Sequence, residues 1–181
     1  MKGIILNITE QFLKDKFGED VLHEVREKST LSTQVHFSGP GTYPDSDWVA
    51  LLSTTSDILN IPLKQLQVLL GQYAFMQLAE RFPQFVVLYQ HPKEFLLTVE
   101  HMIHIEVRKM YADSTPPRFI YVDSAPNELI ITYYSERKLY SFMEGILKGV
   151  EAYYKIPFTQ EQKIYTENGV EQCDYKLVFS A

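Results

Sequence analysis

Apolar residues recur every three or four positions through the first half of the chain, a period typical of helices that bury one face. The run from Ile4 to Leu13 follows this period, and Gly18 is a natural stop. From Ser29 to Ser46 the period is lost, and Gly39-Pro40-Gly41 predicts a loop. The pattern also predicts a short helix capped by Asp20, a helix capped by Asp45 or Ser46, and a longer one from Pro62 to just before Pro83.

The second half begins with a predicted helix from Pro92 to about Tyr111, with a continuous apolar stripe from Phe95 to Met110. After Pro116-Pro117 the period changes to two. The β-branched and aromatic runs Arg118–Val122 and Glu128–Ser135 then predict a hairpin.

The last part is predicted as a helix over about residues 136–154 and two strands joined at Asn168-Gly169, the strongest hairpin signal of the chain. Gly145 and Gly149 permit another element to approach this helix closely. Helices followed by antiparallel strands predict an α+β fold, in which an N-terminal helical part packs on a C-terminal antiparallel sheet with helices.

The composition narrows the class of protein. The 181 residues are 45% hydrophobic, which suits a single domain over residues 1–181. A net charge of −6 without a long Lys/Arg run argues against nucleic acid as a partner. Cys173 is the only cysteine, so no intrachain disulfide can form. Polar residues from Asn7 to Gln11 interrupt any signal peptide, and no apolar run approaches the roughly 20 residues of a membrane helix. We therefore expect a cytoplasmic protein without a membrane segment.

The segment Tyr133-Tyr134-Ser135-Glu136-Arg137 carries the clearest candidate chemistry. In an extended strand, Tyr133, Ser135 and Arg137 project from one face, because side chains alternate. Two hydroxyls and a guanidinium would then be available to a carboxylate or phosphate. The same residues are also common at an exposed strand end, so the strand alone leaves both interpretations open.

His104 lies beside the apolar stripe of the helix over 92–111. A lone helical histidine is commonly a structural residue, but a neutral imidazole is also a good ligand for haem iron. His101 is one turn away and Glu100 precedes it, so His101 and His104 could instead hold zinc. That spacing is weak evidence without two further ligands.

In order and spacing, these residues resemble the haem nitric oxide/oxygen binding (H-NOX) domain, stand-alone bacterial type, which is related to the sensor domain of soluble guanylate cyclase. The Tyr-x-Ser-x-Arg motif and the helix histidine both match. Met1-Lys2-Gly3-Ile4-Ile5 resembles the family's start, Thr115-Pro116-Pro117-Arg118 its proline pair, and residues 168–175 its last hairpin. The likeness covers nearly the whole chain.

The resemblance implies haem b (iron protoporphyrin IX) between the helical part and the sheet. It implies that His104 ligates the iron and that Tyr133, Ser135 and Arg137 hold the propionates. Pro117 resembles the proline that presses on the porphyrin, although a loop proline that ends a helix explains it equally well from the residues.

Gas selection follows from the distal side of the haem, where family members that hold oxygen place a tyrosine. The matching residue here is Phe142, and no other matching position can donate a hydrogen bond; these positions are Ile5, Ala74, Leu78 and Ile146. The resemblance therefore implies a nitric oxide sensor, with carbon monoxide as a further ligand. A rotated helix could still bring Tyr73 or Tyr140 inward.

The sequence contains no nucleophile–base arrangement and no phosphate-binding loop, so we expect no enzymatic activity. The resemblance implies a separate signalling partner, either a histidine kinase or a cyclic-dinucleotide enzyme (diguanylate cyclase or phosphodiesterase). Some members also hold a structural zinc, but only Cys173 matches its ligands here, so we expect no such site. The alternative function is a haem-free module that binds a fatty acid or another amphipathic carboxylate. The sequence leaves the partner's identity, the oligomeric state and the direction of the signal open.

Overall fold

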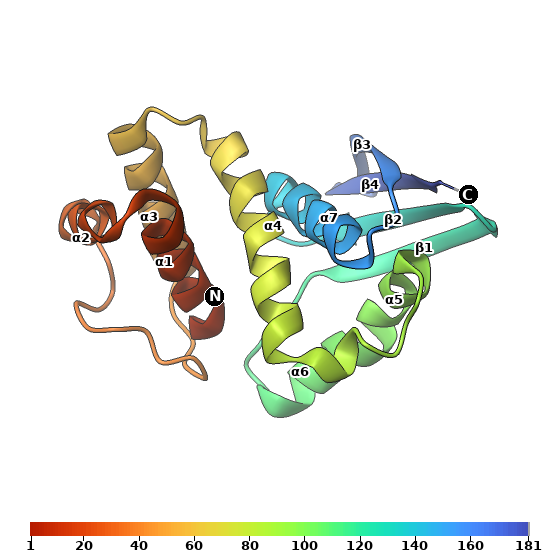
Figure 1. Cartoon of the computed structure of the whole chain (residues 1–181), viewed down its shortest axis with the longest axis horizontal. Coiled ribbons are helices and arrows are strands. Elements are labelled where there is room, and N and C mark those ends of the chain that lie inside the picture. Colours follow the sequence, from red (N-terminus) through yellow and green to blue (C-terminus); the bar gives the residue numbers. More distant parts are fainter. Residues whose placement is uncertain (181) are drawn as a thin grey trace. The chain divides into compact units, whose positions relative to one another are not determined.

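The computed structural model describes residues 1–180, which fall into two compact units (Figure 1). Unit 1 comprises Met1–Leu78 and Ser141–Gly149, and unit 2 comprises Ala79–Tyr140 and the chain from Val150 onward. The prediction of a single domain over residues 1–181 remains a prediction. The helices are α1 (Gly3–Phe17), α2 (Glu19–Lys28), α3 (Asp45–Leu59), α4 (Leu63–Arg81), α5 (Pro92–Thr98), α6 (His104–Met110) and α7 (Tyr140–Tyr154). The strands are β1 (Arg118–Ala125), β2 (Glu128–Tyr134), β3 (Phe158–Glu167) and β4 (Val170–Phe179). The predicted α+β class is confirmed.

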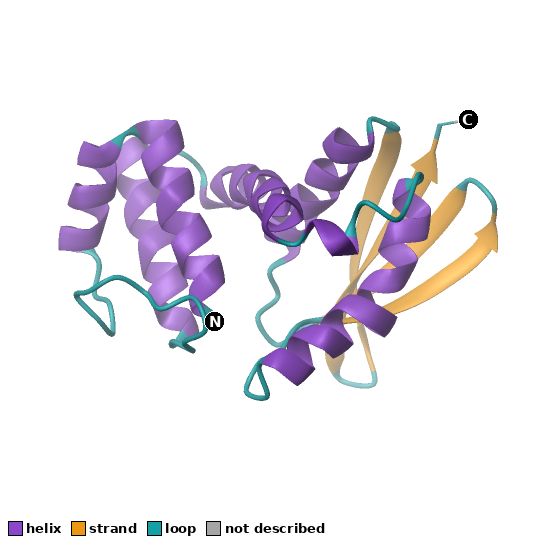
Figure 2. Cartoon of the chain, turned by 60° about the horizontal axis from the view of Figure 1, so that its bottom comes forward, coloured by secondary structure: helices purple, strands orange, loops and turns teal. Residues whose placement is uncertain are grey.

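The first three helices lie side by side in unit 1 (Figures 1 and 2). Their apolar faces meet in a core whose fully buried side chains include Phe12, Leu13, Trp48, Leu51 and Leu52. Burial of this apolar surface is the main stabilising term for such a helical layer. No helix within residues 1–180 combines the length and the apolar character that crossing a bilayer requires.

Two predicted helix caps were wrong. Gly18, and not Asp20, is the N-cap of α2, and Pro44 precedes α3 in place of Asp45 or Ser46. Asp45 instead accepts a hydrogen bond of 2.6 Å from the amino group of Met1. The Asp45 carboxylate therefore binds the amino group of Met1 and does not cap the helix as predicted.

Helices α4 and α7 approach closely within unit 1, as the glycines of α7 predict. A Cβ atom on Gly145 would lie 2.1 Å from the Val68 carbonyl oxygen, and one on Gly149 would lie 2.6 Å from the Phe75 Cβ. Gly71 on α4 is equally close to α7, because its Cβ would lie 2.2 Å from the Phe142 carbonyl oxygen. Only glycine fits at these contacts.

Unit 2 contains an antiparallel sheet of four strands in the order β1-β2-β4-β3 (Figure 2). The hairpin turn between β3 and β4 has positive φ at Asn168 and Gly169, as its Asn-Gly pair predicts. One face of the central strands is apolar and buried, with Leu129, Ile131, Tyr175 and Leu177 at most 1% exposed. The hairpin of β1 and β2 is also confirmed, and β1 continues to Ala125 past a bulge.

The predicted continuous helix over 92–111 is instead α5, a π-helical turn over Val99–Ile103, and α6. The predicted apolar stripe is buried only at Phe95 and Leu96, whereas Met110 is 52% exposed. A π turn inserts one residue into the helical repeat, so it rotates every later side chain away from the stripe drawn for a continuous α-helix.

The segment after β2 is also different from its prediction. The strand ends at Tyr134 and α7 begins at Tyr140, so residues 135–139 form a turn rather than strand and helix. The Lys138 amide donates to the Ser135 carbonyl at 3.1 Å, and Lys138 has a φ of 49°. Within this turn the Ser135 hydroxyl oxygen accepts from the Arg137 amide at 3.2 Å, a local bond that competes with strand pairing.

Candidate functional site

His104 is the first residue of α6 and its side chain is only 12% exposed. Its Nδ1 lies 3.0 Å from Oε2 of Glu100, one turn earlier. Its ring lies 5.2 Å from that of Phe119 on β1, centroid to centroid. Burial lowers the pKa of His104, although hydrogen bonds to the Glu100 carboxylate and the Pro117 carbonyl act in the opposite direction. Burial thus favours the neutral form of the ring, which is the form that binds metals.

Sequence reasoning noted Glu100 only as the neighbour of His101, but the structure places it against His104. The signal that could have found it is the spacing of four residues, which puts two side chains on the same helix face. His101 itself is exposed, and its ring lies 6.0 Å from that of Tyr121. Among residues 1–180, no group of three or more His, Cys, Asp or Glu side chains could hold a metal ion, so the zinc alternative lacks further ligands.

Tyr133, Ser135 and Arg137 do come together, although a turn and not a strand achieves this. Tyr133 is 4% exposed at the end of β2. Burial raises its pKa, and its hydroxyl hydrogen-bonds with the Ser135 side chain. The Arg137 guanidinium donates to the Thr115 carbonyl oxygen at 2.7 Å and to the Thr115 hydroxyl at 2.8 Å. Two hydroxyls and a permanent cation therefore share one corner of unit 2.

The loop between α6 and β1 links this corner to His104. Thr115 contacts Arg137, and the Pro117 carbonyl lies close enough to the His104 ring to raise its pKa. Aromatic rings continue the link, since Phe119 lies 6.0 Å from Tyr133 between ring centroids. The predicted residues of unit 2 thus form one connected cluster around the loop that carries Pro117.

The predicted distal residues belong to unit 1. The Phe142 ring lies 5.6 Å from that of Trp48 in an edge-to-face arrangement. The Trp48 indole N–H donates to the Thr9 hydroxyl at 3.0 Å, and this hydroxyl donates to the Ile5 carbonyl at 2.8 Å. The sequence did not single out Trp48 as a neighbour of the distal residues, and its indole N–H is taken up by Thr9. Ala74 is fully buried, while the other predicted members are half-buried, namely Ile5, Leu78, Phe142 and Ile146.

The two tyrosines left open by the sequence both donate to carboxylates. The Tyr73 hydroxyl donates to Oδ2 of Asp15 at 2.5 Å, and the Tyr140 hydroxyl donates to Oε1 of Glu171 at 3.0 Å. A charged acceptor holds a hydroxyl more strongly than a neutral one.

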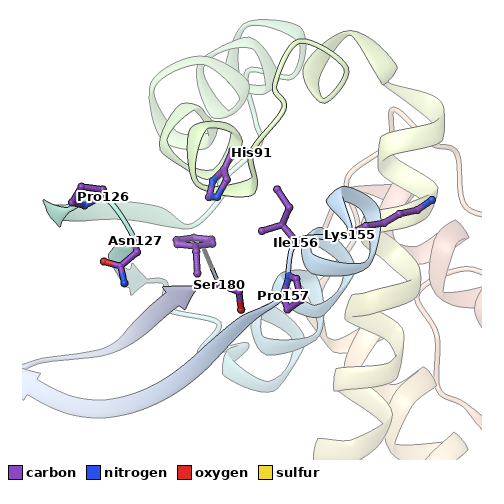
Figure 3. A pocket seen from close by; sticks show the side chains of 8 residues that line it. His91, Pro126, Asn127, Lys155, Ile156, Pro157 and Ser180 are labelled. Carbon is purple, nitrogen blue, oxygen red and sulfur yellow. The ribbon is translucent and has the colours of Figure 1, made fainter.

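A shallow cavity of about 460 Å³ lies elsewhere in unit 2, where His91, Asn127 and Phe179 are among its lining residues (Figure 3). His91 is the N-cap of α5, and its Nδ1 accepts from the Lys93 amide at 3.2 Å. His91 therefore caps the start of α5. The cavity contains none of the predicted site residues.

The comparison with protein families shows which family the chain belongs to. The model described as Haem-NO-binding matches residues 2–162 of the chain. This chain belongs to the H-NOX family. A comparison with curated proteins gave no match.

Solved H-NOX structures have a similar fold. The Fe(II) unliganded H-NOX protein from K. algicida is 25% identical, with a TM-score of 0.89 and coverage of 100% of this chain and 97% of that chain. An H-NOX protein from S. oneidensis in the Fe(II)NO ligation state is 24% identical, with a TM-score of 0.90 and coverage of 100% of both chains.

H-NOX domains are haem-based gas sensors, so haem b is the cofactor of this chain. The donor set in unit 2 fits that group. A histidine that donates its Nδ1–H to a carboxylate carries its lone pair on Nε2, ready for iron. Arg137 with the hydroxyls of Ser135 and Tyr133 would supply the positive charge and donors that two propionates require.

Proposed function

We propose that this H-NOX protein senses nitric oxide and passes the signal to a separate protein. His104 would be the axial ligand, and Tyr133, Ser135 and Arg137 would hold the propionates, with Pro117 against the porphyrin. Ferrous haem with one protein ligand supplies an open position for a gas. The S. oneidensis H-NOX structure is in the Fe(II)NO ligation state, which supports nitric oxide as the ligand of this chain.

The observation that carries the choice of gas is the chemistry of the proposed distal residues. Ile5, Ala74, Leu78, Phe142 and Ile146 have no side-chain hydrogen-bond donor. The Trp48 indole, whose ring contacts Phe142, donates its N–H to Thr9. Bound oxygen is polarised and depends on a donor more than nitric oxide does, so this set favours nitric oxide and carbon monoxide over oxygen.

The output would pass to a histidine kinase or to a diguanylate cyclase or phosphodiesterase, as in the stand-alone type that the chain resembles. A cytoplasmic location remains a prediction from the sequence.

The test uses the purified chain with one equivalent of haem. Ferrous protein should bind nitric oxide and carbon monoxide stoichiometrically in anaerobic titrations, and should form no lasting oxygen complex in air-saturated buffer. A stable oxygen complex would contradict the choice of gas. If the protein stays colourless with ample haem and binds a fatty acid, the sensor hypothesis is wrong and the carboxylate-binding alternative is favoured.

A further inference from the structure

The Glu100 carboxylate joins His104 to the neighbouring strand. Its Oε2 atom lies 3.0 Å from Nδ1 of His104 and accepts the Phe119 amide at 3.1 Å. Its Oε1 atom accepts a hydrogen bond from Nη2 of Arg108, with 3.4 Å between the two atoms. The side chain is only 15% exposed, so these partners, and not water, take up most of its hydrogen-bonding capacity.

The π turn provides a second anchor on the backbone of Glu100. This turn is closed by the His104 amide, which donates to the Val99 carbonyl five residues back. The Glu100 amide donates to the Tyr121 hydroxyl at 3.3 Å. Strand β1 therefore holds Glu100 at two points, through the Tyr121 hydroxyl and the Phe119 amide. Because the Glu100 carboxylate is held in place, it can also hold the orientation of the His104 ring that donates to it.

We propose that Glu100 is a positioning residue for the iron ligand, because it accepts the Nδ1–H of His104 and so directs Nε2 to the metal. This inference rests on the proposed function, in which His104 ligates haem iron. A carboxylate acceptor draws the Nδ1 proton away, which increases the electron density that the ring donates to iron. Glu100 thereby sets both the direction of His104 and the strength of the iron–histidine bond.

The experiment compares Glu100→Gln with Glu106→Gln in the haem-loaded protein. Glutamine keeps the size of the side chain and removes its charge. Glu106 is a carboxylate on α6 that pairs with Lys109 at 2.7 Å, so its variant is a matched control for the loss of one charge. The readouts are the iron–histidine stretching frequency by resonance Raman, the reduction potential of the haem iron, and haem affinity.

Glu100→Gln should lower the stretching frequency and raise the reduction potential, and should weaken haem binding by about 10- to 100-fold, as loss of an outer partner does at metal sites. Glu106→Gln should match the wild type in all three. If Glu100→Gln lowers the thermal midpoint of the apoprotein, Glu100→Asp keeps the charge, shortens the side chain and should shift the frequency in the same direction.

An unchanged frequency in haem-loaded Glu100→Gln would overturn this inference alone, and would assign the ring orientation to the Pro117 carbonyl. A wild-type protein that binds haem without any iron–histidine mode would overturn the proposed function and the inference together.

Discussion

The guanidinium of Arg137 binds Thr115 at two points, the carbonyl oxygen at 2.7 Å and the hydroxyl at 2.8 Å. One residue thus connects the turn after β2 with the loop that leads to Pro117 and β1. Its cationic fork can serve a carboxylate in the same corner, because Ser135 and Tyr133 hydrogen-bond there as well.

Arg137→Ala is therefore expected to speed haem loss more than Ser135→Ala does. A charge-assisted hydrogen bond is worth about 1.5–3 kcal/mol, against about 0.5–1.5 kcal/mol for a neutral one. The measurement is the rate of haem transfer to an excess of an acceptor protein. Lys138→Ala is the control, because this cation of the same turn pairs with Glu171 at 3.1 Å. Equal rates for the Arg137 and Ser135 variants would reject the ranking.

His104→Gly should remove the axial ligand and leave space for a small molecule. The ferrous spectrum should change, and added imidazole should restore a histidine-like spectrum. His101→Gly, one turn away and exposed, should leave the spectrum as in the wild type. An unaltered ferrous spectrum in His104→Gly without imidazole would assign the ligand to another residue.

Phe142→Tyr should prolong an oxygen complex by adding a hydroxyl on the proposed distal side. A neutral hydrogen bond contributes about 0.5–1.5 kcal/mol, which corresponds to roughly a twofold to twelvefold slower oxygen loss. Stopped-flow mixing of ferrous protein with oxygenated buffer measures it. Tyr73→Phe and Tyr140→Phe should not change gas binding, because each hydroxyl donates to a carboxylate. A stable oxygen complex in the wild type that Tyr73→Phe abolishes would show that this hydroxyl is the donor.

Gly145→Ala should destabilise the fold, because its Cβ would lie 2.1 Å from the Val68 carbonyl oxygen. Helices α4 and α7 must then separate locally, and overpacking of this kind costs about 1–3 kcal/mol. The free energy of unfolding in urea is the readout. Gly39→Ala, with no heavy atom within 4 Å of the added Cβ, should stay within about 0.5 kcal/mol of the wild type. A Gly145→Ala variant as stable as Gly39→Ala would mean that the helices are not in this contact.

The sequence pattern predicted correctly those elements whose formation depends on residues within the element itself. The period of the apolar positions predicted α1 and α4, and Asn168-Gly169 predicted the hairpin of β3 and β4. Both signals act within a few residues, since a helix face repeats every turn and a two-residue hairpin needs positive φ. The Tyr-x-Ser-x-Arg spacing likewise identified three residues that do gather, even though the predicted strand is a turn.

Partners that come from distant parts of the chain were decided only by the tertiary structure. The Glu100 carboxylate is held by the amide of Phe119, and Arg137 is held by Thr115. The period of a helix identifies the residues on a face, but not the strand that will pack against that face. The π turn shows the same limit, because the Tyr121 hydroxyl that accepts from the Glu100 amide comes from β1. The sequence by itself determined which residue types can ligate and hold haem. Packing of β1 against the helix determined which way His104 is turned, because hydrogen bonds and burial, and not spacing, orient a side chain.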